Sequence, residues 1–222
     1  MAVTSAPILR RVLSLPWLVF YGVGVTIGAG IFALIGEVVL VAGDHAVWSF
    51  LLAGLVAALT GFSYMLLSAA FPRAAGPAMF VRAGLGITLG RVMGFAVVAV
   101  AITSSATISL AFAGYMSTYL PLPQWLLLLS GIGLLCLVAM VGVKESVAFA
   151  AVVTVIEVGA LLWVIAAGVP HLEQANAWRA LAPPPYAASM TVVSGAFLAF
   201  FAFIGFEDIV NMSEETHDAS RT

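Results

Sequence analysis

The sequence predicts an all-α integral membrane protein with six transmembrane helices. Of its 222 residues, 63% are hydrophobic and only 8% are charged, a composition that is incompatible with a water-covered globular domain. The apolar residues gather into six runs, each close to or above the roughly 20 residues that a helix needs to span a bilayer. None of the runs alternates polar with apolar residues, so the strand pattern of a transmembrane β-barrel is not met.

The six runs define the expected helices in order along the chain. They are residues 17–41, 46–71, 92–120, 125–143, 147–169 and 190–212. The first run follows Arg10 and Arg11, as the apolar core of a secretory signal does. It is much longer than the about 7 to 15 residues of such a core, so we expect it to remain as a helix. The single cysteine, Cys136, excludes a disulfide within this chain, and we expect it to pack.

The basic residues predict the orientation in the membrane. Arg179 falls on one side of a six-span arrangement, and the other seven fall on the opposite side: Arg10, Arg11, Arg73, Arg82, Arg91, Lys144 and Arg221. Lys and Arg are enriched in cytoplasmic loops. We therefore expect a multi-pass protein of the plasma membrane, with a cytoplasmic N-terminus at residues 1–16 and a cytoplasmic tail at residues 213–222.

The first run contains five glycines within "GVGVTIGAGIFALIG", residues 22–36. In lipid, a broken helix is tolerated only where the freed backbone groups are buried in protein or face a cavity. Small residues at four-residue spacing, such as Gly24 and Gly28, also suit close helix packing, which is the alternative. For the mid-span segment Gly28-Ala29-Gly30 we favour a binding role, because a second run is interrupted in a similar way.

That second interruption lies in the sixth run, "SGAFLAFFAFIGFEDIVNMSEE", residues 194–215. Gly205 lies within an aromatic stretch, and Glu207 and Asp208 lie inside the apolar segment. Ionisable residues at such positions are costly in a membrane and commonly functional. The sixth run therefore supplies a partner feature for the interrupted first run.

Four motifs occur in the order typical of one family. They are "IGAGIF" (27–32), "FPRAAGPAMFVR" (71–82), "GVKESV" (142–147) and "FFAFIGFEDIVNMSEE" (200–215). With them, nearly the whole chain resembles amino acid permeases of the amino acid/polyamine/organocation superfamily, especially cationic-amino-acid-transporter-like members. The resemblance implies a five-plus-five inverted-repeat fold, with residues 17–169 as the first repeat and residues 190–212 as the opening helix of the second.

The resemblance also implies a substrate site and a function, the secondary transport of amino acids by alternating access. Backbone N–H groups of Ala29 and Gly30, after Gly28, would hold the substrate carboxylate, because a half-helix N-terminus suits an anion. A side chain at Gly28 or Gly30 would block the approach of the ligand. Ser105, near the midpoint of the third run, is a further candidate, with packing as its alternative. The carbonyls expected to hold the α-ammonium group belong to Thr26, Phe201, Ala202 and Ile204.

Energy coupling is expected to involve Glu157, which lies near the midpoint of the fifth run. A charge there costs roughly 2.5 to 3.5 kcal/mol on insertion scales, so such residues usually serve a pathway or a proton relay. Some relatives place a lysine near this point, whose ammonium group is thought to replace a coupling sodium ion. We expect proton symport through Glu157, with Glu207 as a second candidate. The alternatives are a protonated structural Glu157 and a Glu207 that merely pins the sixth helix.

Other classes of protein remain as alternatives. The family's fold has ten core helices, so we expect a truncated permease whose C-terminal helices are missing from this sequence. A complete six-helix channel or a dimerising membrane subunit is the alternative. An enzyme is not expected, because His45, His171 and His217 fall in loops or the tail, and only a Glu157/Glu207 dyad could supply catalytic carboxylates. The expected partners are the amino acid, a proton and the lipid bilayer, with no cofactor, metal or nucleic acid.

Overall fold

The structure is a computed structural model that describes residues 13–71, 76–172, 177–212 and 215–216. Much of the expected cytoplasmic N-terminus and tail lies outside these ranges, and so do Arg10, Arg11, Arg73, His217 and Arg221. The described residues form helices and short connections, with one isolated bridge that pairs Leu13 with Thr216 in parallel. The all-α class predicted from composition is therefore confirmed.

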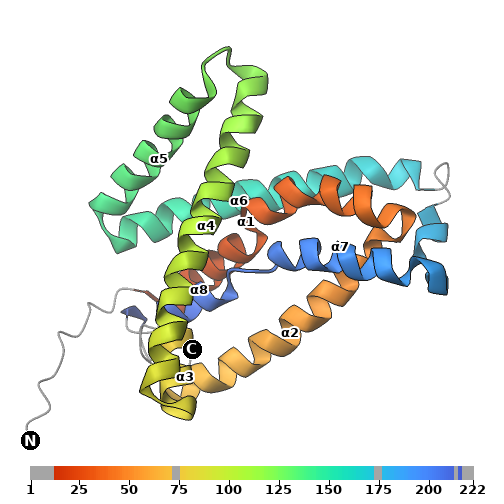
Figure 1. The fold of residues 1–222 in the computed structure, drawn as a ribbon. Coiled ribbons are helices and arrows are strands. Elements are labelled where there is room, and N and C mark those ends of the chain that lie inside the picture. The colour runs from red at the N-terminus through yellow and green to blue at the C-terminus, as the bar shows by residue number, and fades with distance from the viewer. Residues whose placement is uncertain (1–12, 72–75, 173–176, 213–214, 217–222) are drawn as a thin grey trace, which may run out of the picture. The chain divides into compact units, whose positions relative to one another are not determined.

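Eight α-helices follow one another along the described chain (Figure 1). They are α1 (Leu15–Ala42), α2 (Ala46–Ala70), α3 (Gly76–Leu85), α4 (Ile87–Tyr119), α5 (Gln124–Val141), α6 (Val143–Gly168), α7 (Ser189–Phe201) and α8 (Phe206–Asn211). Short 3-10 turns include η1 (Gly43–His45), η3 (Ala177–Leu181) and η4 (Tyr186–Ala188). Within the described ranges, five stretches are long and apolar enough to cross a membrane, and the first of them, Leu15–Ala70, contains both α1 and α2. Apart from α3, the helices match the six predicted runs, with α7 and α8 sharing the sixth.

The chain divides into two compact units. Unit 1 consists of Met1–Val19, Tyr64–Phe149 and Glu207–Thr222, and unit 2 consists of Phe20–Ser63 and Ala150–Phe206. Unit 1 thus contains α3, α4 and α5, whereas unit 2 contains most of α1, α2 and α6 together with α7.

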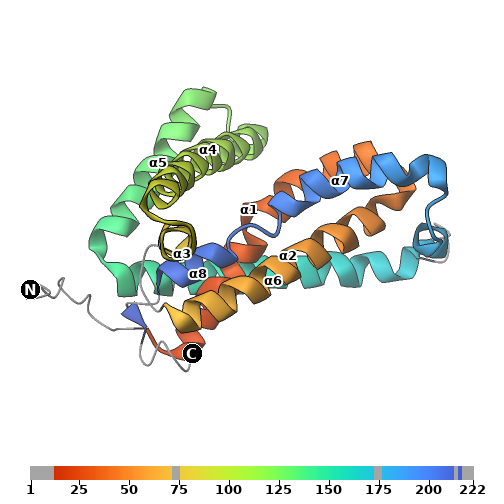
Figure 2. The same ribbon diagram turned by 60° about the horizontal axis from the view of Figure 1, so that its bottom comes forward.

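The core of unit 2 lies where α1, α2 and α7 pack together (Figure 2). Val38 of α1, Ala53 of α2, and Ala196 and Ala199 of α7 form its buried cluster. Ser49 is buried between α2 and α7 and donates a hydrogen bond from Oγ to the Val192 carbonyl at 2.9 Å. Small residues of this kind allow the close backbone approach on which helix association in lipid depends.

Unit 1 is built around α4. The short helix α3 packs against the start of α4, where a Cβ atom placed on Gly90 would lie 2.9 Å from Arg82 Cα. Gly86, with φ of 96°, makes the turn between these two helices. The motif at residues 71–82 lies between the second and third predicted runs, where no helix was expected, so α3 was missed. Pro77 in the first turn and Gly86 after the last residue are the start and stop signals that could have revealed it.

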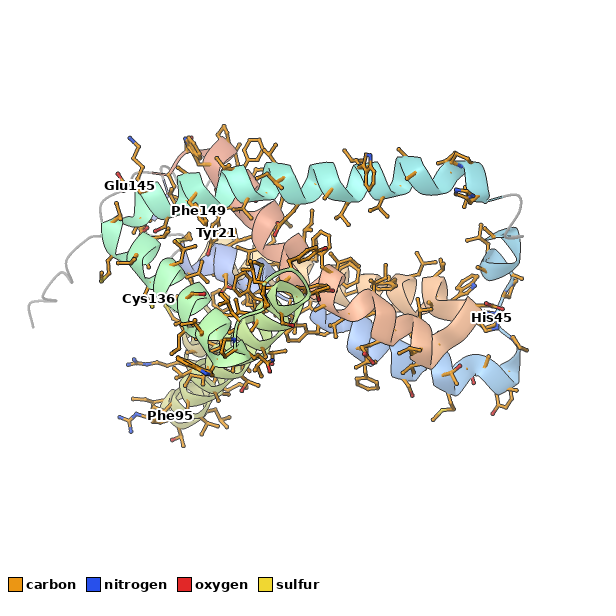
Figure 3. The ribbon with its side chains drawn as sticks, turned by 90° about the horizontal axis from the view of Figure 1, so that it is seen from above. Tyr21, His45, Phe95, Cys136, Glu145 and Phe149 are labelled. Carbon is orange, nitrogen blue, oxygen red and sulfur yellow. The ribbon has the colours of Figure 1, made fainter. Side chains whose placement is uncertain are left out.

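The surface of unit 1 is strongly apolar (Figure 3). Phe95 on α4 is 80% exposed, and Cys136 on α5 is exposed as well, contrary to the packing role expected for it. Long helices with exposed apolar side chains are the elements that a bilayer covers. The free thiol therefore lies on the same kind of surface as Phe95.

One non-helical contact joins the two ends of the described chain within unit 1. The Leu13 N–H donates to the Glu215 carbonyl at 3.0 Å, and Leu13 and Thr216 are only 2% and 1% exposed. Nearby in sequence, α8 packs against the start of α3, because a Cβ atom on Gly76 would lie 3.2 Å from Asn211 Oδ1. The segment before α1 and the segment after α8 are therefore tied together.

Candidate functional site

The interruption in α1 lies at Gly28. Its φ of 38° and ψ of −163° are non-helical and divide α1 into two half-helices. An L-residue rarely adopts a positive φ, which explains why glycine stands there. Ala29 and Gly30 follow at the beginning of the second half-helix. Backbone N–H groups at such an end have no acceptor within their own helix, and they carry the positive end of its dipole.

The second interruption separates α7 from α8. Residues 202–205 form a turn between Phe201 and Phe206, and the turn ends at Gly205 with φ of 136°. Hydrogen bonds between residues three positions apart stabilise this turn, including Phe203 N to Phe200 O at 3.0 Å and Ile204 N to Phe201 O at 3.2 Å. The Phe201 carbonyl therefore accepts a hydrogen bond within the turn.

The two interruptions lie against one another, main chain to main chain (Figures 1 and 2). A Cβ atom on Gly30 would lie 2.8 Å from Ala202 Cα and 3.4 Å from the Phe201 carbonyl oxygen. A Cβ atom on Gly205 would lie 2.6 Å from the Val25 carbonyl oxygen. The predicted main-chain ligands of the first and sixth runs thus come from two segments in contact, all within unit 2.

Glycine is required at positions 28 and 30 for different reasons. No heavy atom of the described residues lies within 4 Å of a Cβ atom placed on Gly28, so the constraint there is its backbone conformation. At Gly30 the constraint is the neighbouring backbone of Ala202. Sequence analysis gave ligand approach as the reason for both glycines, and the structure adds a packing reason for Gly30.

A buried hydroxyl that sequence analysis missed lies beside α1. Thr154 of α6 is 2% exposed, and its Oγ1 lies 2.8 Å from the Ala150 carbonyl and 3.3 Å from the Phe20 carbonyl. Gly24 leaves the space for it, because a Cβ atom there would collide with Thr154 Oγ1. Glu157 follows Thr154 by three residues and so shares the side of α6 that faces α1. Glu157 itself is partly exposed.

The remaining candidates belong to unit 1. Glu207 opens α8 and interacts electrostatically with Tyr64 and with Asp208, and the Asp208 carboxylate also accepts a hydrogen bond from the Asn211 side chain. Ser105 is exposed on α4, and its carbonyl accepts a hydrogen bond from Ser109 Oγ at 2.7 Å.

The neighbouring hydroxyls on α4 show the same pattern. Thr103 and Thr107 donate to the carbonyls four residues earlier, at 2.8 Å and 2.9 Å. These hydroxyls therefore bond to the backbone of their own helix. In the part of the chain that the structure describes, no group of three or more His, Cys, Asp or Glu side chains could hold a metal ion.

Comparison with known proteins identifies the family. The family described as amino acid permease matches residues 12–222. Among curated relatives, cationic amino acid transporter 9, chloroplastic, of Arabidopsis thaliana is 33% identical, over 98% of this chain and 42% of that protein. The branched-chain amino acid permease BcaP and the methylthioribose transporter of Bacillus subtilis are 25% and 28% identical, each over 96% of this chain and 50% of the relative.

No solved structure gives a significant match. The chain spans about two fifths to one half of the length of these curated relatives. The matching family and relatives are permeases and transporters rather than enzymes, in agreement with the expectation from the sequence. The chain belongs to the amino acid permease family.

Proposed function

We propose that the protein containing this chain transports α-amino acids across a membrane, and that main-chain groups of the two interrupted segments hold the substrate. The observation that supports this proposal is the contact between the break at Gly28 and the turn at residues 202–205, where Gly30 and Ala202 meet backbone to backbone. A glycine break inside a spanning helix exposes polar groups that must find a partner. An amino acid carries two charged groups that suit such a place.

Each end of the substrate has matching groups. The α-carboxylate binds the N-terminal end of the second half of α1, at Ala29 and Gly30, where N–H groups and the helix dipole favour an anion. The α-ammonium group donates hydrogen bonds to backbone carbonyl oxygens, which are acceptors. The carbonyls proposed for this role belong to Thr26, Phe201, Ala202 and Ile204. Since every α-amino acid has these two groups, the main-chain contacts select α-amino acids as a class and do not distinguish their side chains.

The names of two relatives are consistent with a site that recognises the groups common to all α-amino acids. Cationic and branched-chain amino acids, named for two of them, differ in side chain but share the α-amino and α-carboxylate groups. Methylthioribose, named for the third, has neither group. A substrate without an α-amino acid moiety is therefore the second candidate, and the experiment below distinguishes it.

We propose proton symport with alternating access as the energy source, with Glu157 as the proton carrier and Glu207 as the second candidate. Glu157 lies near the middle of α6 and on its α1-facing side, one turn from Thr154. A carboxyl group at that depth is favoured in its neutral form, which lets it take up a proton together with substrate. The protein is proposed to lie in the plasma membrane with both ends of this chain cytoplasmic, because of the distribution of its basic residues.

The proposal is tested by uptake of a radiolabelled mixture of amino acids into cells that express the full-length protein, followed by competition. Unlabelled amino acids should compete, whereas their methyl esters and N-acetyl derivatives should not, since each derivative loses one of the two charged groups. Free methylthioribose serves as the contrasting competitor. Equal competition by the blocked derivatives, or inhibition by methylthioribose alone, would exclude the main-chain site.

A further inference from the structure

The turn at residues 202–205 is held by the Phe203 side chain as well as by its main-chain contact with α1. Phe203 lies in the middle of this turn, between Ala202 and Ile204, whose carbonyls are proposed to hold the α-ammonium group. The Phe203 side chain packs against the buried cluster of Val38, Ala53, Ala196 and Ala199. An aromatic ring fixed in such a cluster has few rotamers and anchors its own backbone firmly.

The end of this ring lies over a glycine of α2. A Cβ atom placed on Gly54 would lie 3.3 Å from Phe203 Cζ and 3.6 Å from Cε1. Gly54 lies within regular helix, and its φ is outside the range that disfavours side chains. The backbone conformation at position 54 therefore does not require glycine. The Phe203 ring does require it, because the ring lies where a side chain at position 54 would be.

The turn is thus fixed on two sides by consecutive residues. Ala202 contacts Gly30 of α1 through its main chain, and Phe203 contacts Gly54 of α2 through its ring. A displacement of the ring moves the Phe203 Cα atom and with it the carbonyls on either side. Hydrogen bonds from an ammonium group weaken steeply when distance and angle depart from their optimum.

We propose that Gly54 and the Phe203 ring position the ammonium-binding carbonyls and so set the affinity for substrate. This inference rests on the proposed function, because it needs the turn to be part of the substrate site. It assigns Gly54 a role as a positioning residue on a helix that the family resemblance did not connect with binding.

The experiment compares two substitutions on the same helix. Gly54→Ala adds a methyl group against the ring, which must shift by a few tenths of an ångström. Gly61→Ala is the matched control, because it lies two helical turns further on. Apart from its chain neighbours and the backbone of its own helix, no heavy atom of the described residues is within 4 Å of its Cβ position. Initial uptake rates are measured over a range of amino acid concentrations and normalised to the protein present in the membrane.

Gly54→Ala should raise KM about fivefold, while the maximal rate per transporter stays near that of the wild type. A factor of about five in affinity corresponds to about 1 kcal/mol, which is the lower end of the usual cost of overpacking. Gly61→Ala should leave both parameters unchanged. A purely structural role for Gly54 would lower the amount of protein or the maximal rate and leave KM unaltered.

A double substitution supplies the decisive control. Phe203→Leu removes Cζ and should itself raise KM, because the shorter side chain no longer reaches Gly54. In Gly54→Ala combined with Phe203→Leu, the added methyl group fills part of the space, so KM should rise less than the product of the two single effects. If Gly54→Ala does not reach the membrane, the KM of Phe203→Leu still tests whether the ring positions the turn.

Three results would overturn the inference. An unchanged KM in Gly54→Ala, or KM effects that simply multiply in the double variant, would show that the ring does not position the turn while leaving the transporter proposal intact. Absence of amino acid uptake by the wild-type protein would overturn the proposed function, and this inference with it.

Discussion

Replacement of Gly30 by alanine is the smallest perturbation that separates the two interrupted segments. The new Cβ atom would lie 2.8 Å from Ala202 Cα, 3.4 Å from the Phe201 carbonyl oxygen and 3.5 Å from Ala202 Cβ. Carbon atoms are in optimal contact at about 3.5 to 4.0 Å. The segments must therefore separate by at least about 0.7 Å, and the atom that has to move belongs to the backbone rather than to a flexible side chain.

Forced separation of packed elements typically costs about 1 to 3 kcal/mol. If the turn carries the ammonium-binding carbonyls, their displacement destabilises the substrate-bound state by this amount. Each 1.4 kcal/mol is a factor of ten, so kcat/KM for uptake should fall by about 5- to 150-fold. The assay is the initial rate of labelled amino acid uptake by the full-length protein, normalised to the amount in the membrane.

Gly36→Ala is the control, because it lies on the same helix with no heavy atom of the described residues within 4 Å of its Cβ position. Alanine is favoured over glycine in a helix interior by about 1 kcal/mol, so Gly36→Ala should insert and transport normally. If Gly30→Ala transports as well as Gly36→Ala, the two segments do not form the substrate site in the way that the contact implies.

Further predictions concern the proton carrier, the buried hydroxyl and the orientation. Glu157→Gln should retain substrate binding but lose the acceleration of uptake by an inward proton gradient, and unchanged acceleration would leave Glu157 a structural residue. Thr154→Val should lower stability in detergent by about 0.6 kcal/mol and by at most about 1.7 kcal/mol, as measured by chemical unfolding, because one interhelical hydrogen bond is lost. Thr154→Ser should behave like the wild type, and an equal loss in that variant would exclude the hydroxyl as the cause. Reporter fusions should place Asp44 outside and Arg221 in the cytoplasm, and an external Arg221 would contradict the six-span orientation.

The membrane class, the spans and the two interruptions could be predicted from sequence because each depends on local chemistry. Apolar runs of the right length form helices in lipid whatever they pack against. Gly28 and Gly205 inside such runs mark backbone conformations that other residues rarely adopt, as their positive φ values confirm. Boundaries were less certain, and α4 begins at Ile87, five residues before the predicted start.

The contacts that position the site could not be predicted, since they join residues far apart in the chain. Thr154 and Phe20 are 134 positions apart, and nothing in their neighbourhoods marks them as partners. Gly54 is likewise an ordinary helix glycine until the Phe203 ring is placed over it. The short helix α3 was missed for another reason, because it is too short to span a bilayer and a search by apolar length passes over it.

The hydrogen bond from Leu13 to the Glu215 carbonyl also bears on how the protein is made. Its two residues leave the ribosome about 200 positions apart, which at about 5 to 20 residues per second is a delay of about 10 to 40 seconds. The partner of Gly30, Ala202, emerges nearly as late. During that interval the first span is already in the bilayer with its break uncovered, although polar backbone in lipid needs a partner. The break in α1 is therefore covered only after the segment that follows α7 has been made, and nascent chains that stall before the sixth span should be the preferred targets of membrane quality control.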